Sequence, residues 1–213
     1  MALDYAAART NMVENQVRTN DVTDLPIQDA MRVVPRERFC PPGKAYLAYA
    51  EAQVPYAPGY FLMEPRDVSK LLQALYPWEG QTALAIAAPY AAAVLARMGV
   101  QVTLLMPQGE AYQAAAAALE GEKVTVVAGS LTGAIPGGLY DVVICEASVP
   151  RAPASWIEAV GMGGRLGVVE RDGPVGKACL YFRGEDGIAA RREVFDSSPH
   201  MLAGFEPAAS FSF

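Results

Sequence analysis

The spacing of apolar residues divides this chain into two regions of different character. Up to about residue 80, apolar positions recur at the intervals typical of amphipathic helices, interrupted by a loop rich in proline and tyrosine at residues 36–64. After residue 81, short apolar runs alternate with helical segments. We therefore expect an N-terminal helical and loop segment, residues 1–80, packed on a sheet domain, residues 81–213, with the two forming one compact unit.

In the first region, the expected helices begin and end at recognisable residues. Thr23 or Asp24 can cap the second helix, and Pro35 ends it because proline lacks the amide hydrogen that a helix needs. Pro65 suits the first turn of the third helix. The predicted helices span residues 2–17, 27–34 and 65–76.

In the second region, the apolar runs are typical of strands buried on both faces. Such strands, alternating with helices, indicate an open and mostly parallel α/β sheet covered by helices. Phe205, Phe211 and Phe213 are expected to finish a strand or dock onto this sheet. Strands are predicted at residues 82–87, 100–106, 124–127, 141–145, 165–169, 176–182 and 191–195, and helices at residues 90–98, 109–119 and 153–160.

Composition excludes several classes of protein. Hydrophobic residues make up 52% of the 213 positions, which is incompatible with long disorder. No run of about 18 apolar residues exists, since Pro89 and Arg97 interrupt the richest stretch, so we expect no membrane span. The net charge of −6 argues against a basic surface for nucleic acid.

Three cysteines and one histidine limit the possible chemistry. Cys40, Cys145 and Cys179 show no CxxC spacing, and their odd number without a signal peptide indicates reduced thiols and a cytoplasmic location. A metal site or a Ser-His-Asp triad needs a histidine with partner residues, whereas His200 stands alone near the C-terminus. We predict no metal site and interpret His200 as a surface or packing residue.

The expected ligand edge of the sheet lacks the usual polar groups. Nucleotide-type ligands bind beyond the carboxyl ends of parallel strands, at glycine-rich turns and acidic residues. Here the first strand leads into Ala87-Ala88-Pro89-Tyr90, and the second ends in Leu104-Leu105-Met106. Gly129-Ser130-Leu131 follows the third strand, again without an acid. Glu146 follows the fourth strand, and we interpret it as a solvated loop acid.

Several segments along the chain together form a recognisable pattern. They are Met12-Val13-Glu14-Asn15-Gln16-Val17-Arg18, Ala30-Met31, Val34-Pro35-Arg36-Glu37-Arg38-Phe39, Leu47-Ala48-Tyr49-Ala50, Val54-Pro55, Tyr140-Asp141-Val142-Val143-Ile144 and Gly163-Gly164-Arg165-Leu166. Taken in this order, they resemble the protein-L-isoaspartate O-methyltransferases, a family that transfers a methyl group from S-adenosylmethionine to the α-carboxylate of isoaspartyl residues in damaged proteins. The resemblance covers about residues 10–170 and implies a Rossmann-like class I methyltransferase sheet behind an N-terminal helical segment.

The resemblance fails where the family binds its cofactor. The acid of the family's first cofactor motif corresponds to Ala85, and its glycines are replaced around Ala87 and Pro89. The ribose-binding acid corresponds to Leu105, and the aspartate near the adenine corresponds to Ser130. Losing the ribose acid alone removes hydrogen bonds of roughly 1.5–3 kcal/mol, or about one to two decades of affinity. We therefore expect no cofactor, and no catalytic residue is assigned.

The family's substrate loop has also become apolar. Of its sequence, Gly59 and Pro65 remain, while Phe61 and Met63 stand at the threonine and serine positions. Four large apolar residues in a loop suggest either a contact site or a segment that folds into the vacated pocket as core, and the sequence leaves both open. The candidate contact loop comprises Tyr60, Phe61, Leu62, Met63 and Glu64.

Three hypotheses follow from these departures. The first is a non-catalytic relative of the methyltransferases that binds a protein partner or self-associates. The second is an active protein-L-isoaspartate O-methyltransferase that uses S-adenosylmethionine in an unusual pocket, which rests on the resemblance alone. The third is an apolar small-ligand binder that uses Phe61, Met63, Leu105 and Met106.

Overall fold

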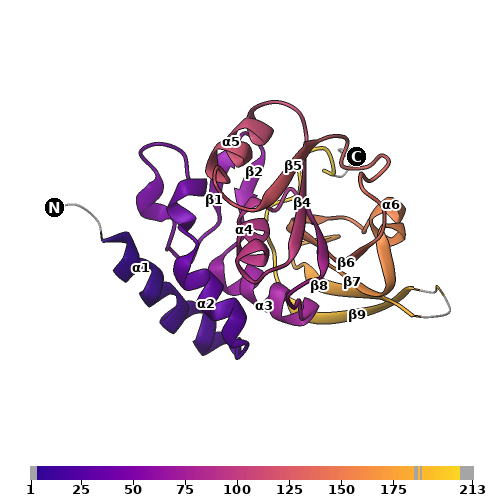
Figure 1. Ribbon diagram of the computed structural model, residues 1–213, viewed down its shortest axis with the longest axis horizontal. Helices are drawn as coiled ribbons and strands as arrows, with labels where there is room; N and C mark the ends of the chain where they lie inside the picture. Colours follow the sequence, from indigo (N-terminus) through magenta and orange to yellow (C-terminus); the bar gives the residue numbers. More distant parts are fainter. Residues whose placement is uncertain (1–3, 185–186, 188, 207–213) are drawn as a thin grey trace, which may run out of the picture.

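A seven-stranded sheet forms the centre of the computed structural model, which describes residues 4–184, 187 and 189–206 (Figure 1). The strand order is β5-β4-β3-β6-β7-β8-β9, in which the first five strands are parallel and the last two are antiparallel. The predicted open and mostly parallel sheet is thereby confirmed. The strands are β3 (Thr82–Ile86), β4 (Gln101–Met106), β5 (Val124–Ala128), β6 (Tyr140–Val149), β7 (Val160–Glu170), β8 (Lys177–Arg183) and β9 (Ala189–Asp196).

The strand register brings the carboxyl ends of the central strands together. Ile86 at the end of β3 pairs with Leu105 of β4 on one side and with Cys145 of β6 on the other. Because these strands are parallel, the turns that follow them share one edge of the sheet, where ligands of such folds bind. We call this the carboxyl edge.

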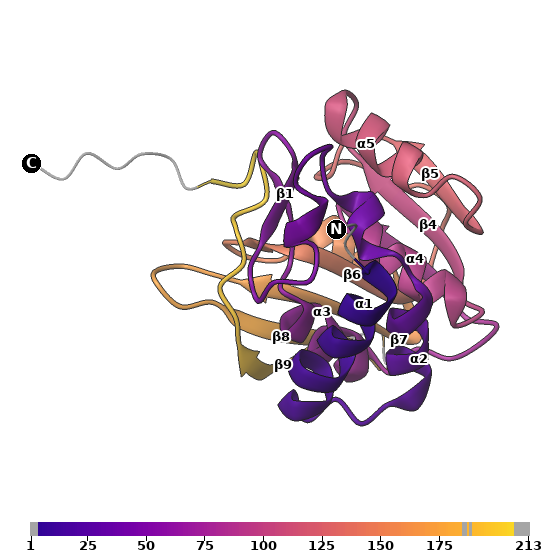
Figure 2. The same cartoon turned by 90° about the vertical axis from the view of Figure 1, so that its left-hand side faces the viewer.

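Helices cover the sheet in two layers on one side. Figures 1 and 2 place α3 and α4 next to the sheet, with α1 and α2 outside them, as their packing contacts require. Asp24 caps α2 by accepting a hydrogen bond from the backbone N–H of Ile27. The helices are α1 (Tyr5–Met12), α2 (Leu25–Val33), α3 (Pro65–Leu75), α4 (Pro89–Arg97), α5 (Glu110–Ala118) and α6 (Ala154–Glu158).

The N-terminal segment differs from its prediction at two places. After α1 the chain continues as a π-helical turn, Val13–Val17, and a short 3-10 turn, Arg18–Asn20. The predicted loop at 36–64 contains 3-10 turns at Arg36–Phe39 and Ala45–Leu47 and an antiparallel hairpin, β1 (Val54–Ala57) and β2 (Tyr60–Leu62). Strands of three or four residues are too short to produce a recognisable alternation of apolar and polar positions.

After β9 the chain crosses the carboxyl edge as a segment that we call the C-terminal strap, residues 197–206. Its backbone pairs with β6: Ser148 N–H donates to His200 O at 2.9 Å, and Leu202 N–H donates to Ser148 O at 2.8 Å. The ring of Phe205 lies 5.6 Å from that of Trp156, so this phenylalanine docks beside the sheet as expected. Phe211 and Phe213 lie outside the described residues.

None of the helices within residues 4–184, 187 and 189–206 combines the length and apolarity of a membrane span.

The three cysteines are free thiols, with Cys145 and Cys179 buried.

Candidate functional site

The turn after β3 keeps an unusual backbone although its glycines are gone. Ala87 has a φ of +47°, in the left-handed region that glycine adopts most readily. Its N–H donates to Leu105 O at 3.0 Å, which ties the turn to β4. Pro89 then opens α4. The sharp turn is therefore retained, but Cβ atoms now stand where a cofactor would need bare backbone.

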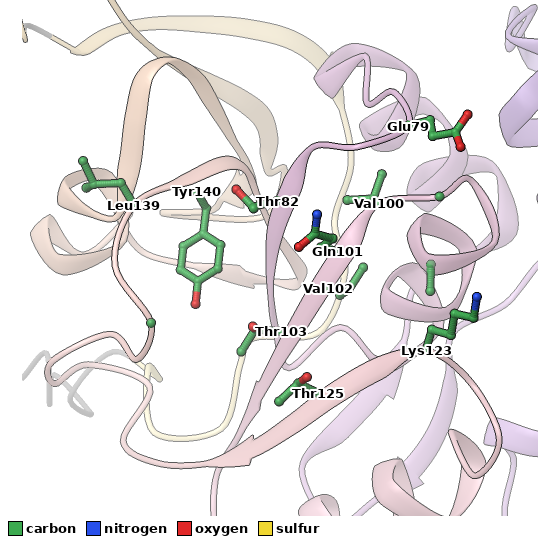
Figure 3. Close-up of a pocket in the computed structure, with 13 residues that line it drawn as sticks. Glu79, Thr82, Val100, Gln101, Val102, Thr103, Lys123, Thr125, Leu139 and Tyr140 are labelled. Carbon is green, nitrogen blue, oxygen red and sulfur yellow. The ribbon is translucent and has the colours of Figure 1, made fainter.

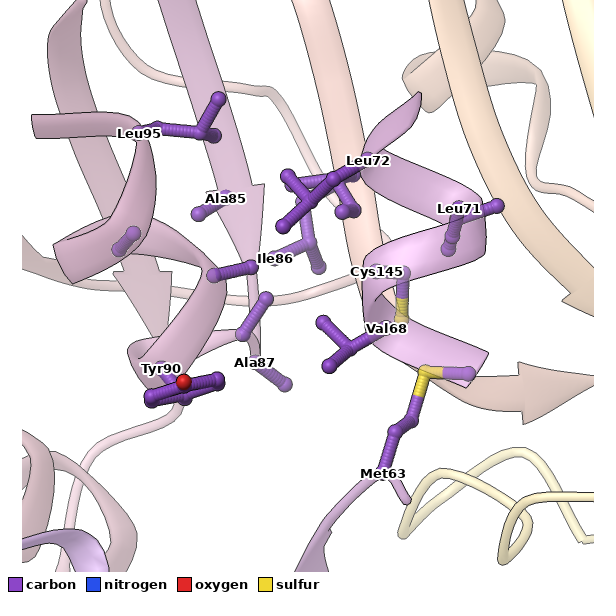
Figure 4. Packing of buried hydrophobic residues seen from close by; sticks show 14 of the residues in the cluster. Met63, Val68, Leu71, Leu72, Ala85, Ile86, Ala87, Tyr90, Leu95 and Cys145 are labelled. Carbon is purple, nitrogen blue, oxygen red and sulfur yellow. The ribbon is translucent and has the colours of Figure 1, made fainter. Parts of the chain in front are cut away.

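The space beside this turn is filled by the chain's own side chains. Figure 4 shows Ala87 at the end of β3, with Tyr90 of α4 on one side and Met63 and Val68 on the other. All four side chains are buried. The hydroxyl of Tyr56 lies 3.5 Å from Ala87 O and closes the turn from the hairpin side.

A small cavity of about 10 Å³ remains above Ala87, where the β1–β2 hairpin meets the C-terminal strap. This volume is on the scale of one water molecule, whereas ligand pockets have roughly 300–1,000 Å³. The residues that line it are Tyr56, Gly59, Tyr60, Phe61, Ala87, Ala147, His200, Met201 and Leu202.

The other predicted cofactor positions do not converge on a binding surface. Ala85, Pro89 and Leu105 are buried, and Leu105 leaves no polar group at the end of β4. Ser130 is exposed, and its hydroxyl accepts a hydrogen bond from Gly133 N–H within its own loop at 3.1 Å. The residues present therefore do not fit S-adenosylmethionine held in the manner that the family resemblance implies.

The candidate contact loop divides between core and surface. Leu62 and Met63 are buried, whereas Tyr60, Phe61 and Glu64 are partly exposed. The ring of Phe61 stacks on the exposed ring of His200 at a centroid distance of 3.6 Å, which agrees with a packing role for this histidine. The possibility that the loop folds into the core thus holds for Leu62 and Met63, whereas the contact site stays a prediction for the partly exposed residues.

The interpretation of Glu146 as a solvated loop acid was wrong. It lies inside β6, one residue beyond the last pairing with β3, and is 1% exposed. Its Oε1 accepts a hydrogen bond from the backbone N–H of Ala91 at 2.8 Å. Burial raises the pKa of Glu146 to about 7, although Arg36 and the amides of Ala91 and Tyr90 act in the opposite direction.

Arg36 is a further buried charge that sequence reasoning missed. It belongs to the 3-10 turn before the hairpin and is completely buried. Its Nε donates to Ala48 O at 2.8 Å, and its Nη2 donates to Met63 O. The guanidinium also lies 4.6 Å from the centroid of the Tyr90 ring. Arg36 therefore anchors the end of the hairpin beside α4.

Glu170, at the end of β7, forms a second polar centre that the sequence did not reveal. Its Oε1 accepts from Ala152 N–H at 2.9 Å and from the Tyr181 hydroxyl at 2.5 Å. Its Oε2 accepts from Arg151 Nη1 and Arg191 Nε, both at 2.9 Å. Burial alone would raise the pKa of Glu170, but these four donors together hold it below its usual value. Glu170 thus acts as a structural junction between β7, β8 and β9.

A hollow of about 630 Å³ lies at the opposite edge of the sheet (Figure 3). Threonines 82, 103 and 125 and Tyr140 line it, at or near the amino-terminal ends of their strands. Ligands of open parallel sheets bind at the carboxyl ends, so this hollow is not a cofactor site of that type. Among the described residues, no group of three His, Cys, Asp or Glu side chains is arranged to hold a metal ion.

Comparisons with known proteins agree with the resemblance seen in the sequence. The family model described as protein-L-isoaspartate(D-aspartate) O-methyltransferase matches residues 7–178. A protein-L-isoaspartate O-methyltransferase of Methylorubrum extorquens is 34% identical over 195 residues, covering 88% of this chain and 85% of the relative. A Rhodopseudomonas palustris protein named protein-L-isoaspartate O-methyltransferase 1 is 36% identical over 171 residues, which cover 78% of this chain and 70% of the relative.

A solved structure supports the fold assignment. A Plasmodium falciparum protein described as a protein-L-isoaspartate O-methyltransferase, in complex with S-adenosyl-L-homocysteine, matches with a TM-score of 0.78 and 15% identity. The match covers 91% of this chain and 97% of that structure. The chain therefore has the class I methyltransferase fold and belongs to the protein-L-isoaspartate O-methyltransferase family.

Proposed function

We propose that this chain is a family member that has lost methyl-transfer chemistry and acts as a protein-binding module. The observation that carries the proposal is the cavity of about 10 Å³ above Ala87, where a cofactor would need room for its whole length. An apolar small ligand meets the same obstacle. Met63, Leu105 and Met106, which were expected to line its site, are buried in the hydrophobic core.

Several separate parts of the chain close the space above Ala87. A small rearrangement of side chains would therefore not open it. The hairpin contributes Tyr56 and Phe61, the strap contributes Met201, and β6 contributes Ala147. Opening the cleft would break the backbone pairing between Ser148 and the strap and would expose apolar surface to water. It would still leave Leu105 and Ser130 at the positions where the family keeps its anchoring acids.

The protein-binding part of the proposal rests on the exposed side of the candidate contact loop. A groove of about 440 Å³ lies between the hairpin and α5, with Pro41, Pro55, Pro58 and Phe61 among its lining residues. Lys44 and Glu110 also line it. Grooves with apolar floors and a few charged groups are typical of contact sites between proteins.

The relatives favour a second candidate, an active methyltransferase that acts on isoaspartyl residues with S-adenosylmethionine. The two relatives described above carry that enzyme's name, and the family model covers most of the chain. This candidate requires the hairpin and the strap to move away from Ala87 when the cofactor binds. It also requires other groups to replace the missing acids and glycines.

Two measurements separate the candidates. Isothermal titration with S-adenosylmethionine and S-adenosylhomocysteine should give no specific heat, and an isoaspartyl peptide should receive no methyl group. The Methylorubrum extorquens relative, assayed in parallel, checks that peptide and cofactor are competent. A saturable micromolar isotherm together with methyl transfer would establish the second candidate and refute the first.

Self-association is the form of protein binding that can be tested with this chain alone. Sedimentation velocity over a range of concentrations should detect a dimer, and Phe61→Glu should weaken it because the charge would enter the groove. Phe182→Glu provides a matched control, since Phe182 is an exposed phenylalanine of β8 outside the groove. Equal weakening by both variants would assign the contact to a different surface.

A further inference from the structure

The first turn of α4 receives its cap from another part of the chain. Helix N-termini present unpaired backbone N–H groups and a partial positive charge, so they favour an anion. Pro89 has no N–H, and Ala88 at the N-cap position offers no side-chain acceptor. The acceptor is instead the Glu146 carboxylate, 2.8 Å from Ala91 N. In nucleotide-binding sheets, the corresponding helix terminus often holds an anionic group of the ligand.

Arg36 provides the positive charge beside this carboxylate. Its guanidinium lies against the Tyr90 ring, and it is near enough to lower the pKa of both Glu146 and Tyr90. No hydrogen bond or ion pair joins Arg36 directly to Glu146 in the described structure. A buried pair of opposite charges that do not touch is costly unless something lies between them.

Three polar atoms in this cluster have no hydrogen-bond partner among the residues that the structure describes. They are Arg36 Nη1, the Tyr90 hydroxyl oxygen and Glu146 Oε2, and all three are buried. One is a donor, one can donate or accept, and one is an acceptor, which is the set that a single water molecule can satisfy. Buried water typically makes about three hydrogen bonds to such groups.

We propose that Glu146 is an internal ligand of the cleft: its carboxylate occupies the anion position at the N-terminus of α4 and, through one shared water molecule, joins Arg36 and Tyr90 in a latch. The latch connects β6, α4 and the 3-10 turn at Arg36. Because Arg36 also donates to Met63 O, it holds the end of the hairpin against the turn at Ala87. The chain thus satisfies with its own carboxylate the terminus that a bound anion would otherwise cap.

The direction in which Tyr90→Phe changes the stability of the protein tests whether the shared water is present. If the Tyr90 hydroxyl were truly unpaired, Tyr90→Phe would remove a buried unsatisfied group and leave stability unchanged or higher. If the hydroxyl belongs to the latch, we expect Tyr90→Phe to raise the unfolding equilibrium constant about tenfold, the effect of one lost hydrogen bond. In a Glu146→Met background the same change should have an effect of less than about twofold, since the network is already broken.

Tyr140→Phe is the matched control, because its hydroxyl donates to Pro136 O at 2.6 Å and not to this cluster. Its effect should be equal in both backgrounds. A neutral or stabilising Tyr90→Phe, or equal effects of Tyr90→Phe in both backgrounds, would overturn the proposal.

Two further readouts keep the latch testable if Glu146→Met folds poorly. A high-resolution crystal structure of the wild-type chain should show one water within hydrogen-bond distance of all three atoms, whereas direct contact between Arg36 and Glu146 would overturn the proposal. Amide hydrogen exchange in Tyr90→Phe should accelerate in the hairpin but not in β9. The inference is independent of the proposed function: cofactor binding would refute that function, whereas absence of the water would refute the latch alone.

Discussion

Two neighbouring strands, β6 and β7, carry the same side chain in opposite circumstances. Glu146 in β6 and Glu170 in β7 both lie on the carboxyl side of the sheet, and both are buried. Glu170 accepts five hydrogen bonds, two of them from arginines and one from the Cys179 thiol, and its pKa is lowered. Glu146 accepts from backbone amides of α4, leaves Oε2 without a protein partner, and has a pKa raised to about 7.

The difference shows that burial alone does not decide what a carboxylate does for stability. At Glu170, the surrounding donors outweigh the cost of removing the charge from water. At Glu146, that cost is the dominant influence, because the neighbouring cleft is filled with alanine, leucine and methionine side chains. Neutralising these two residues should therefore change stability with opposite dependence on pH.

The largest effect is expected for Glu170→Gln. The substitution removes the charge that Arg151 and Arg191 share. Because hydrogen bonds to charged groups contribute about 1.5–3 kcal/mol each, it should lower the free energy of unfolding by about 3 kcal/mol at pH 7. The folded-state pKa of Glu170 is lowered, so the wild-type advantage is complete above the unfolded pKa and disappears as pH falls through the folded pKa. Urea unfolding of both proteins at several pH values between neutral and acidic measures this change. A pH-independent difference would contradict the charge assignment.

Glu146→Gln should show the opposite slope. The folded-state pKa of about 7 exceeds the ordinary glutamate value of 4.5, so the unfolded chain ionises first as pH rises. The wild type should therefore lose stability relative to Glu146→Gln between about pH 4.5 and 7, by roughly 2–3 kcal/mol, and no further above that range. Chemical denaturation across this range, with Glu170→Gln as the control of opposite sign, provides the measurement. If the wild type instead became more stable relative to Glu146→Gln as pH rises, Glu146 would behave like Glu170 and the expected contrast would be wrong.

A smaller effect is expected for Tyr181→Phe, which removes one donor from Glu170 and keeps the ring. The loss of a hydrogen bond to a charged group should cost about 1.5 kcal/mol. The remaining donors should hold Glu170 ionised, with its pKa moved toward the ordinary value. Thermal or urea denaturation gives the first quantity, and NMR titration of the Glu170 carboxyl gives the second. An unchanged pKa would mean that the arginines and the Ala152 amide set the pKa of Glu170 without the tyrosine.

Arg151→Ala should have the smallest effect. Its side chain is 70% exposed although its guanidinium lies 2.9 Å from Glu170. Exposed ion pairs contribute about 1 kcal/mol or less, so the variant should remain within that range of the wild type in 0.15 M salt. The difference should diminish further at high salt. A cost that approaches that of Glu170→Gln would show that the donors to Glu170 act as one unit.

Local patterns predicted most of the sheet and the helices of the fold. The apolar runs around Val143 and Leu104, the cap at Asp24 and the proline at the start of α3 each act within a few residues, so the sequence displays them directly. The hairpin was missed because a strand such as Tyr60–Leu62 is too short to show a period. The family resemblance pointed to Leu105, which lies at the carboxyl edge, while its correspondence to a cofactor-binding acid stays a prediction.

The contacts of the candidate site were less predictable, because they join distant parts of the chain. Arg36 and Met63 are 27 residues apart, and Glu146 reaches a backbone amide 55 residues away. A glutamate within the apolar run of β6 was the available signal, but it does not reveal which amide lies nearby. Ala87 likewise gives no indication in the sequence that its backbone adopts a conformation suited to glycine.

The C-terminal strap also gives the molecule an order of assembly. Ser148 pairs with a segment around Met201, 53 residues further along, so β6 leaves the ribosome well before the chain that covers it. During synthesis the turn at Ala87, the hairpin and β6 can come together first, while the upper side of the cleft remains exposed to water. The cleft is therefore completed only when nearly the last described residues have been made. Until then, the carboxyl edge is open to a chaperone or an early partner for longer than the rest of the sheet.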